Sequence, residues 1–396
     1  MWQDERAASS PKLPLMRAQQ DSVDWSVLGY ARSVILCSSA RFELLARWVH
    51  TMQMAFRHKL ERVMTPIRMA QYGTKHGHAI GKLLSMAMNP DVEVVGVFEP
   101  DPEQRRKQQA EGGLLRNIHW FDTKAEMLDD PSIVAIASEG LNSASLEQTA
   151  EIVAAGKHVW YDKPAGQDWP RWQAVMAEAQ ARKLYLQMGY MLRYHNGFRR
   201  IANWTKSGLL GDIFSVRAHM STWISLAQRE VISQHKAGIF YDLAGHMLDQ
   251  VVWLLGRPTR TTGFFHNHAG VVPAFADNTL GVLEYEKAIA FVDIAAMEPR
   301  PMARRFEVYG SRGSAILLEP FEPGHAIRLC LEEADGGYRQ GEQRIPISAQ
   351  SRQELYDREL EAFVAVLTGK QQPDRPASHD LLVQETLLRT TGHIET

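Results

Sequence analysis

The sequence predicts an α/β protein with two folded domains, a doubly wound parallel sheet followed by an α+β domain with a mostly antiparallel open sheet. Three observations predict this. Between Pro66 and Gly189, short apolar runs alternate with amphipathic stretches, which is the pattern of βαβ units. Beyond Gly189, strand-like runs follow one another with few helices between them. The 396 residues exceed one domain of roughly 150, so two or three domains are expected.

The strands and helices of the first domain follow from apolar runs and capping residues. The expected strands are the short apolar runs at 67–72, 92–98, 133–137, 158–161 and 184–189. The expected helices lie between and after them, at 78–88, 102–111, 146–155 and 173–183. Asp101 is placed as an N-cap with Pro102 at the first helical position, and Gly156 ends the helix at 146–155. This order predicts a parallel sheet covered by helices on both faces.

The second domain is expected to be rich in strands. Alternating strand-like runs occur at 213–223, 260–266, 278–285, 288–295, 305–309 and 314–319. Helical spacing marks 198–206, 241–255 and 352–367, and Gly256 and Gly369 close the last two. A series of this kind favours an antiparallel sheet with helices packed against it.

Residues 1–63 differ from the rest and are expected to form an irregular N-terminal extension. The apolar spacing of residues 39–60 is that of a helix, but no partner element is evident. Met64 begins a segment that resembles a domain start, so we hypothesise that translation begins there. The predicted boundaries are 1–63 for the extension, 64–188 for the first domain and 189–396 for the second.

The composition excludes several functional classes. The chain has 44 lysines and arginines against 46 aspartates and glutamates, so no overall positive field favours nucleic acid or an anionic membrane. Its two cysteines, Cys37 and Cys330, cannot build a disulfide scaffold or a cysteine-rich zinc module. No window holds the ~18 uncharged apolar residues of a spanning helix, and Asp4 and Glu5 interrupt any secretory signal. We therefore expect a soluble, cytoplasmic protein with no nucleic-acid or membrane partner.

The first expected strand leads directly into a glycine-containing loop at the position where a dinucleotide fold has its phosphate loop. The loop consists of Gly73, Thr74, Lys75, His76, Gly77 and His78. Glycine permits a tight turn and close backbone approach, and the following helix offers free N–H groups to a pyrophosphate. Lys75 and His78 stand where G-x-G-x-x-G has its second and third glycines, so a plain turn explains the loop about as well when it is taken alone.

Glu99 ends the second expected strand near the spacing of roughly 20 residues at which a carboxylate accepts hydrogen bonds from a ribose. A 2'-phosphate would be repelled by this carboxylate, so the residue favours NAD. Arg105 and Arg106 follow closely and leave NADP open, although both also fit a solvated helix face.

Lys163 and Pro164 follow the expected strand at 158–161. The carboxyl ends of strands are the edge of a doubly wound sheet at which ligands bind, and a lysine there can polarise a substrate oxygen. Without further context, an ordinary surface lysine after a strand is the favoured interpretation of this position.

Asp242, His246 and Asp249 are spaced by four and three residues within the helix expected at 241–255, so they share one face. A carboxylate beside an imidazole orients the ring and raises its basicity towards that of a general base. A structural role is common for this spacing, and a metal site is a second interpretation, but no further histidine or cysteine cluster completes a zinc pattern. The absence of G-x-S-x-G argues against a serine hydrolase.

In their order and spacing, these motifs resemble those of the Gfo/Idh/MocA family of oxidoreductases. Gly156-Lys157-His158-Val159 with Asp162-Lys163-Pro164 resembles the family's A-G-K-H-V-x-x-E-K-P. The segment 237–249 resembles its G-G-x-x-x-D-x-G-x-H-x-x-D. Further likeness lies in 207–213, similar to S-G-x-L-G-x-I, and in 309–313, similar to a G-x-x-G turn before a strand.

The resemblance implies a nicotinamide-dependent redox enzyme. Residues 64–188 would be the NAD(P)-binding Rossmann domain, and 189–396 the substrate-binding domain, whose open sheet commonly mediates oligomerisation, so a homo-oligomer (dimer or tetramer) is expected. By position, Lys163 would contact the substrate oxygen and the nicotinamide region, His246 would take the hydroxyl proton, and Asp242 would support His246. No metal is expected.

Several departures from the family pattern concern the cofactor. Asp162 replaces the usual glutamate, and the loop after the third strand of the sheet carries Ser138 and Glu139 where the family has small residues and proline. Glu139 would either reach the cofactor ribose or face solvent. The residues expected to bind the cofactor are Gly73, Thr74, Lys75, His76, Gly77, His78, Glu99, Ser138, Glu139, Lys163 and Pro164.

The leading functional hypothesis is oxidation of a secondary alcohol on a sugar, cyclitol or similar polyol by NAD, with NADP possible. Polar residues suited to hydroxyl recognition, or equally to packing, are Arg193, Tyr194, His195, Trp223 and His235. One alternative is an NAD-dependent glycoside hydrolase that oxidises and later re-reduces a sugar. Another is a catalytically silent dinucleotide-binding sensor, against which the retention of Lys163, Asp242 and His246 argues.

Overall fold

The computed structural model describes residues 65–318, 320–322 and 324–395, which belong to one compact unit, Thr65–Thr396. The extension predicted at 1–63, the helix predicted at 39–60 and the start predicted at Met64 lie outside the described residues.

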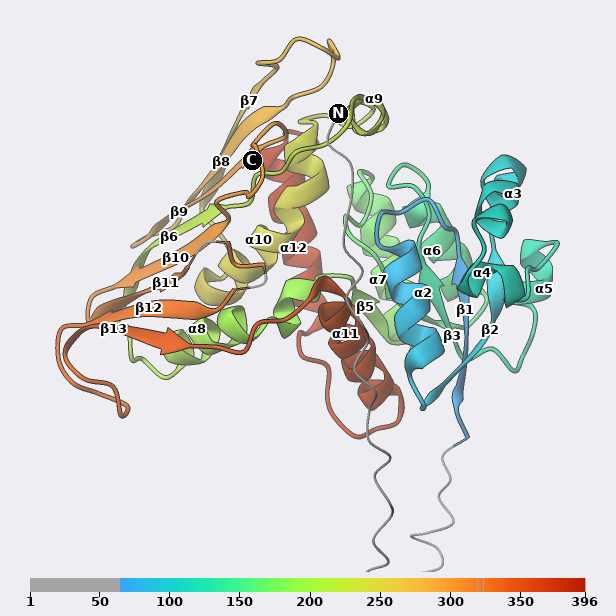
Figure 1. The fold of residues 1–396 in the computed structure, drawn as a ribbon, viewed down its shortest axis with the longest axis horizontal. Helices are drawn as coiled ribbons and strands as arrows, with labels where there is room; N and C mark the ends of the chain where they lie inside the picture. The colour runs from blue at the N-terminus through green and yellow to red at the C-terminus, as the bar shows by residue number, and fades with distance from the viewer. Residues whose placement is uncertain (1–64, 319, 323, 396) are drawn as a thin grey trace, which may run out of the picture. The chain divides into compact units, whose positions relative to one another are not determined.

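The first sheet is a five-stranded parallel sheet, as predicted (Figure 1). Its strands are β1 (Ile67–Tyr72), β2 (Val92–Phe98), β3 (Ala135–Ser138), β4 (His158–Tyr161) and β5 (Leu186–Met188), in the order β2-β1-β3-β4-β5. The chain runs from β1 to one neighbour, β2, and then returns to the opposite side of β1 as β3. This reversal is a topological switch point, where ligands bind beyond the carboxyl ends of the strands.

Helices cover both faces of this sheet. On one face, α6 (Ser145–Ala154) and α7 (Trp169–Ala181) bury apolar side chains against β1 and β3. On the other face, α2 (Ala79–Met88) packs beside α11 (Arg352–Leu367), which comes from the far end of the chain. The second core therefore joins side chains of α2, the sheet and α11, namely Leu83, Met86, Trp160, Leu360 and Phe363.

Further helices flank the β2 edge of this sheet. They are α3 (Pro102–Glu111), α4 (Leu114–Asn117) and α5 (Lys124–Leu128). Asp101 caps α3 by accepting hydrogen bonds from the backbone of Glu103 and Gln104, as the sequence predicted.

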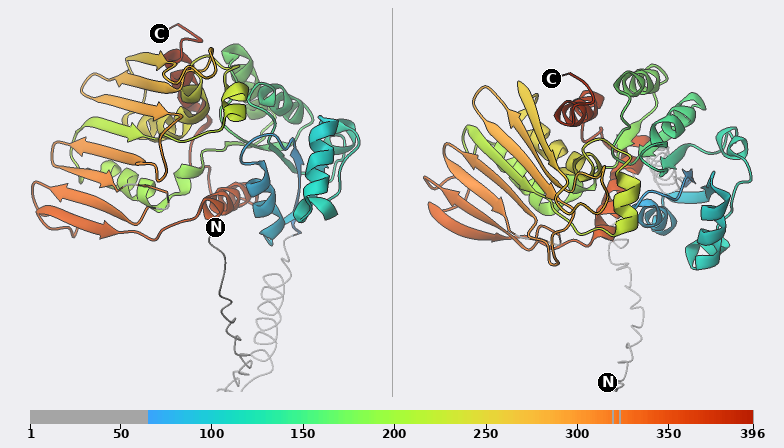
Figure 2. Two further views of the ribbon diagram at one scale, coloured as in Figure 1. Left: turned by 45° about the horizontal axis from the view of Figure 1, so that its top comes forward. Right: turned by 90° about the horizontal axis from the view of Figure 1, so that it is seen from above.

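The second sheet has eight strands and is antiparallel except for one parallel pair, β6 with β9 (Figure 2). The order is β13-β12-β11-β10-β6-β9-β8-β7. The strands are β6 (Ile213–His219), β7 (Arg260–His266), β8 (Asn278–Glu284), β9 (Ile289–Ala295), β10 (Arg305–Gly310), β11 (Gly313–Leu317), β12 (Ala326–Leu331) and β13 (Gly341–Pro346). The predicted fold class is thus confirmed for both sheets.

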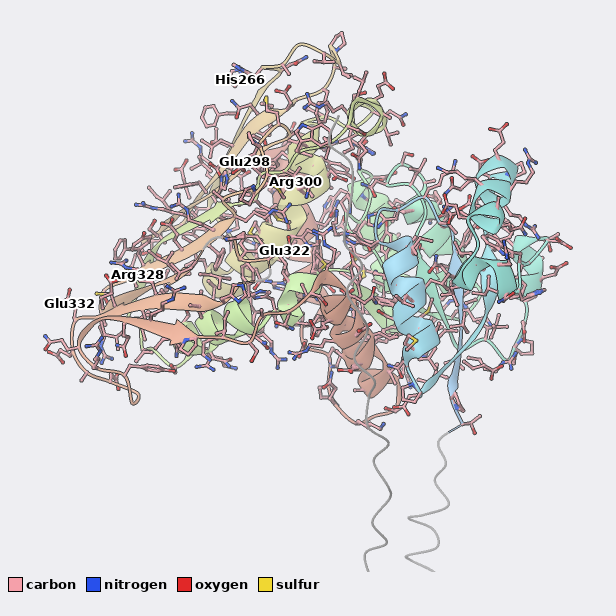
Figure 3. All side chains as sticks on the ribbon, viewed as in Figure 1. His266, Glu298, Arg300, Glu322, Arg328 and Glu332 are labelled. Carbon is pink, nitrogen blue, oxygen red and sulfur yellow. The ribbon has the colours of Figure 1, made fainter. Side chains whose placement is uncertain are left out.

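One face of the second sheet packs on helices. These are α8 (Asn196–Lys206), α10 (Ile239–Leu255) and α12 (Ala377–Thr390), with a 3-10 turn, η3 (Met191–Tyr194), before α8. A further short helix, α9 (Leu226–Ile232), precedes α10. The side chains labelled in Figure 3, among them Glu298 and Arg328, belong to the strands and loops of this sheet.

The structure contains elements that the sequence analysis did not predict. These are β12, β13, α12 and the short helices α4, α5 and α9. In α7, the helix begins at Trp169 rather than 173, because Asp168 accepts a hydrogen bond from the Arg171 N–H and Pro170 stands in the first turn. The domain boundary predicted at 188/189 remains a proposal. Although α11 follows that boundary in the sequence, it packs against one face of the first sheet.

Candidate cofactor and active site

The loop between β1 and α2 lies at the switch point of the first sheet. Gly73 has a φ of +88°, and a Cβ there would lie 2.7 Å from the Gly140 backbone nitrogen in the loop after β3. Glycine is therefore required where the two loops meet. At Gly77 the opposite holds, because among the described residues no atom beyond its chain neighbours would lie within 4 Å of a Cβ. The fold leaves open space above Gly77, which suits the close backbone approach of a dinucleotide pyrophosphate.

A cavity of about 580 Å³ opens beside this loop. Its walls come from the loop, α3, the loop after β3, Lys163, α9 and the first turn of α10. The predicted site residues that line it are Lys75, His76, Gly77, His78, Lys163 and Asp242. The cavity has room for a cofactor portion and a small polar substrate, since ligand pockets commonly span roughly 300–1,000 Å³.

Glu99 is buried at the end of β2 and points into the loop. Its Oε2 accepts hydrogen bonds from the Thr74 N–H and hydroxyl, both 2.7 Å away, and its Oε1 accepts from the Asp101 N–H at 3.0 Å. Lys75 pairs with Asp101 at 2.5 Å. A carboxylate offers about four acceptor positions, so these three hydrogen bonds leave Glu99 able to accept another. Its predicted contact with a ribose remains a proposal.

Ser138 and Glu139 are both buried at the end of β3. The Ser138 hydroxyl accepts a hydrogen bond from Thr149. Glu139 has no exposed surface, and its Oε1 lies 3.0 Å from the Lys82 ammonium. The alternative in which Glu139 faces solvent is therefore wrong, because a buried cation from α2 holds the carboxylate inside.

Lys82 forms the centre of a buried charge cluster. Its ammonium lies 3.1 Å from Asp162 Oδ2 and 4.0 Å from Glu359 Oε2, in addition to Glu139, and sits over the Trp160 ring. We call Lys82, Glu139, Asp162, Glu359, His76 and His78 the Lys82 cluster.

Sequence reasoning missed Lys82 and Glu359. Lys82 stands four residues after His78, so on α2 both project towards the Asp162 carboxylate, and this spacing is the one signal that could have found it. Glu359 reaches the cluster from a helix nearly 200 residues beyond Asp162, and no local pattern links the two.

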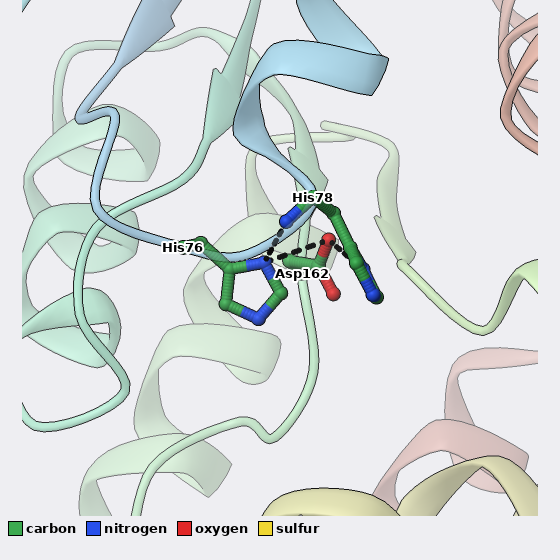
Figure 4. A group of neighbouring side chains, drawn as sticks. All are labelled: His76, His78 and Asp162. Atoms are coloured by element: carbon green, nitrogen blue, oxygen red, sulfur yellow. Dashed lines mark hydrogen bonds and ion pairs between the residues drawn. The ribbon is translucent and has the colours of Figure 1, made fainter. Parts of the chain in front are cut away.

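The two loop histidines meet the same carboxylate oxygen (Figure 4). His78 Nδ1 lies 2.9 Å and His76 Nδ1 3.3 Å from Asp162 Oδ2. Burial lowers the pKa of His76, but Asp162 and Glu139 outweigh it and raise the pKa to about 9. Burial lowers the pKa of His78 to about 4, with the charges of His76 and Lys163 adding to the effect. At neutral pH the loop therefore carries one imidazolium and one neutral imidazole.

His76, His78 and Asp162 also have the ligand types of a metal site, with their ligand atoms within 4.8 Å of one another. However, the Lys82 ammonium already lies against the same Asp162 oxygen. Because a buried cation sits there, the geometry favours a proton and ion-pair network over a divalent ion.

Lys163 lies at the carboxyl end of β4 and lines the cavity. Its backbone N–H donates to Asp162 Oδ1 at 2.7 Å, and its ammonium donates to the Asp242 carbonyl at 2.9 Å. The Lys163–Pro164 peptide is cis. The lysine is thus held between the strand end that carries Asp162 and the first turn of α10.

Asp242 and His246 do not form the predicted pair. Asp242 Oδ1 accepts a hydrogen bond from Asn142 at 3.0 Å, whereas His246 Nδ1 is buried with no hydrogen-bond partner among the described residues. Burial and the charges of Lys163 and His78 hold the pKa of His246 well below its usual range. The expectation that Asp242 raises the basicity of His246 is therefore wrong, and His246 is a neutral imidazole beside the ring of His78, with centroids 6.0 Å apart.

Asp249 belongs to a second buried network. Its Oδ1 accepts two hydrogen bonds from the Arg193 guanidinium, at 2.9 and 2.7 Å, and contacts His379 Nε2 at 2.8 Å. Arg193 also pairs with Asp380. We call Arg193, Asp249, His379 and Asp380 the Arg193 cluster. Arg193 is therefore buried away from the cavity beside Lys163, and so are Tyr194 and His195. Of the other polar residues considered for hydroxyl recognition, His235 lines the cavity and Trp223 is half exposed.

Comparison with known proteins finds family matches over two stretches of the chain. Residues 70–190 match a family described as oxidoreductases with an NAD-binding Rossmann fold, and residues 198–316 match the GFO/IDH/MocA C-terminal domain. None of the helices in the described part of the chain is long and apolar enough to span a bilayer.

Named relatives and solved structures point the same way. The chain is 21% identical over 290 residues to a 1,5-anhydro-D-fructose reductase of Ensifer adhaerens, covering 71% of this chain and 82% of that one. It is 24% identical over 294 residues to an inositol 2-dehydrogenase of Salmonella paratyphi B, covering 73% and 82%. A levoglucosan dehydrogenase, solved in complex with NADH and levoglucosan, has the same fold, with a TM-score of 0.70, 15% identity, and 83% and 97% coverage.

Proposed function

The chain belongs to the GFO/IDH/MocA family of NAD-binding oxidoreductases, and on that basis we propose that it transfers a hydride between a secondary alcohol of a sugar, cyclitol or similar polyol and NAD. The observation that carries the proposal is the position of Lys163, which lines the same cavity as the loop at Gly77. The names of the relatives, a reductase and a dehydrogenase of polyhydroxylated compounds, support this substrate class.

The dinucleotide would be held by the loop between β1 and α2, with Gly73 and Gly77 permitting close approach of its pyrophosphate. Glu99 would bind a ribose hydroxyl, and Ser138, Glu139 and Pro164 would shape the strand ends beside it. The bound nicotinamide supplies the carbon that accepts or releases the hydride.

The contacts of two cations near Glu99 support NAD over NADP. The Arg105 guanidinium is engaged by Asp122 and by backbone carbonyls, and Lys75 is paired with Asp101. These two cations are therefore already neutralised near Glu99, and a 2'-phosphate would gain little from them.

The chain's own residues would orient the substrate and handle its proton. The Lys163 ammonium, fixed by the Asp242 carbonyl, would donate to the substrate oxygen and stabilise negative charge on it. His246, neutral because of its lowered pKa, would accept the hydroxyl proton during oxidation. The Asp242 carboxylate, which faces the cavity beside Asn142, would bind a substrate hydroxyl rather than support His246.

The test is the appearance of reduced nicotinamide absorbance when purified protein meets NAD or NADP and a panel of polyols and sugars. We expect steady turnover with at least one substrate, and roughly 10²–10⁴-fold slower turnover for Lys163→Met and His246→Ala. His266→Ala, an exposed histidine on β7, is the matched control and should leave turnover unchanged. Dinucleotide binding without net reduction would favour the transient-redox hydrolase or the sensor, and changes below threefold in both variants would remove their assigned roles.

A further inference from the structure

The loop between β1 and α2 carries a side-chain cation in addition to its backbone donors. Resting on the proposed dinucleotide function, we propose that His76 binds the pyrophosphate directly through Nε2–H, and that Asp162 connects this contact to Lys163. His76 would then be a binding residue that replaces part of what the missing glycines of the loop ordinarily provide.

The geometry gives the two ring nitrogens of His76 different surroundings. Nδ1 faces the protein, 3.3 Å from Asp162 Oδ2 and 3.4 Å from Glu139 Oε2. Nε2 has no hydrogen-bond partner in the described part of the chain, and the side chain lines the cavity although it is only 8% exposed. The ring is therefore clamped on one side by carboxylates and offers its other nitrogen to a ligand.

The surrounding charges favour a protonated ring. Asp162 and Glu139 outweigh burial and hold the pKa of His76 at about 9, so both nitrogens carry hydrogen at neutral pH. The Lys82 ammonium, 3.1 Å from the same Asp162 oxygen, opposes this protonation, whereas His78 is neutral and carries no opposing charge. Since Lys82 lies 3.0 Å from Glu139 and 3.1 Å from Asp162, it balances part of their charge, and His76 still keeps its proton.

Protonation of His76 also affects a backbone donor. The His78 N–H lies 3.2 Å from His76 Nδ1 and donates to that nitrogen only when the nitrogen lacks a proton. In the imidazolium state this N–H, at the start of α2, is released and becomes available to an anion. The Thr74 N–H of the same loop already donates to Glu99 and is not available to an anion. The released His78 N–H and the cationic His76 side chain compensate for this.

Asp162 links this anion site to the catalytic lysine. Its Oδ2 lies against His76, His78 and the Lys82 ammonium. Its Oδ1 accepts a hydrogen bond from the Lys163 N–H at 2.7 Å. An anion that draws His76 towards the cavity must also act on the carboxylate that fixes the Lys163 backbone. Occupation of the loop therefore helps to set the position of Lys163.

The test is direct binding, measured by calorimetry and by NADH fluorescence, on the full chain and on His76→Gln and His76→Leu. Three probes are used: NADH, ADP-ribose, which carries the pyrophosphate, and inorganic pyrophosphate. We expect both variants to bind all three probes roughly 10- to 100-fold more weakly, because a hydrogen bond between charged groups is lost. His266→Gln should bind like the unchanged protein, and circular dichroism should show all variants folded.

A second readout separates a charged ligand from a merely structural histidine. The affinity of the unchanged protein for ADP-ribose should hold from pH 6.5 to 8 and fall above pH 9, as His76 loses its proton, whereas His76→Gln should show no such fall. Equal affinity and an equal pH profile in the two proteins would overturn the inference while leaving the dinucleotide function intact. Failure of NADH to bind, with pyrophosphate still bound in a His76-dependent way, would instead reject the proposed function alone. Stoichiometric zinc, whose removal abolishes binding, would overturn the inference in favour of a metal site.

Discussion

The Lys82 cluster and the Arg193 cluster both bury a cation among carboxylates, yet they differ in how completely their polar atoms are satisfied. In the Arg193 cluster, the guanidinium donates twice to Asp249 and also to Asp380, and His379 completes the set. In the Lys82 cluster, the ammonium and both oxygens of Glu139 and of Glu359 have no well-aligned hydrogen bond among the described residues.

From this difference in hydrogen bonding, we interpret the Arg193 cluster as structural and the Lys82 cluster as part of the proposed cofactor site. The Arg193 cluster ties α10 to α12 and to the turn before α8, away from the cavity that holds Lys163. The Lys82 cluster lies behind the loop that faces this cavity, and two of its histidines line it. Buried polar groups are normally paired, and the unsatisfied ones of the Lys82 cluster lie directly behind the two histidines that line the cavity.

The largest expected effect is loss of stability on breaking the satisfied network. Arg193→Met leaves Asp249 and Asp380 buried without their cation, so the free energy of unfolding should fall by about 3–5 kcal/mol. Urea unfolding followed by circular dichroism measures this. Arg199→Met, an exposed neighbour on α8, should change it by less than about 0.5 kcal/mol. If both variants were equally stable, the Arg193 cluster would not carry the structural role assigned to it.

A smaller, pH-dependent effect is expected on breaking the other network. Lys82→Met removes the cation from beside Glu139, Asp162 and Glu359. Glu359 already holds its proton below about pH 8, whereas the other two carboxylates can respond by binding protons instead. Their pKa values in the folded state then lie above the unfolded values, so the stability deficit should grow as the pH rises from 5 to 9. The expected deficit at pH 7 is about 2–3 kcal/mol, accompanied by weaker NADH binding. A deficit independent of pH, with unchanged NADH affinity, would contradict the functional assignment of the cluster.

The third effect concerns Glu359 and is absent at low pH. Burial raises its pKa from the usual range to about 8, although Lys82 opposes the shift. The unfolded chain loses the proton near pH 4.5 and the folded chain near pH 8, so this residue lowers stability progressively between those values and fully above pH 8. Glu359→Gln mimics the neutral acid and should match the unchanged protein at pH 5 but exceed it at pH 9, by about 1.4 kcal/mol for each unit of pKa displacement.

Urea midpoints at the two pH values measure this difference. His76, with its raised pKa, contributes stability that is present below pH 6.5 and lost towards pH 9, and both proteins retain this contribution. A Glu359→Gln variant that is less stable than the unchanged protein at pH 9 would mean that the carboxylate is ionised and paired in the fold.

Local sequence signals predicted much of the fold. The strands at 67–72, 92–98, 158–161 and 260–266 have the bounds expected from their apolar runs. Elements with weaker local signals were missed. The strand β13 has no fully buried residue, and α12 follows a proline-containing stretch that reads as a linker. Such elements are stabilised by packing between distant segments, which a local pattern does not contain.

The candidate site was predicted in part. Lys75 to His78, in the loop after β1, and Lys163 do line one cavity, because both segments follow strands that end at the same edge of the sheet. Asp242, His246 and Asp249 share a helix face, which predicted a common site that the structure does not show. Since α10 is buried along most of its length, its successive turns meet the cavity, the core and the Arg193 cluster in sequence. Equal spacing on a helix therefore did not mean a common environment.

The central claim is that a dinucleotide lies over the loop at Gly77, and binding of NADH to Gly77→Leu tests it most directly. In the described part of the chain, no atom beyond the neighbours of Gly77 lies within 4 Å of a Cβ at this position, and the backbone there is not left-handed. The variant should therefore keep the thermal midpoint of the unchanged protein to within a few degrees, while calorimetry detects NADH binding only to the unchanged protein. A Gly77→Leu protein that binds NADH with unaltered affinity would contradict the claim, because the pyrophosphate would then have to lie elsewhere.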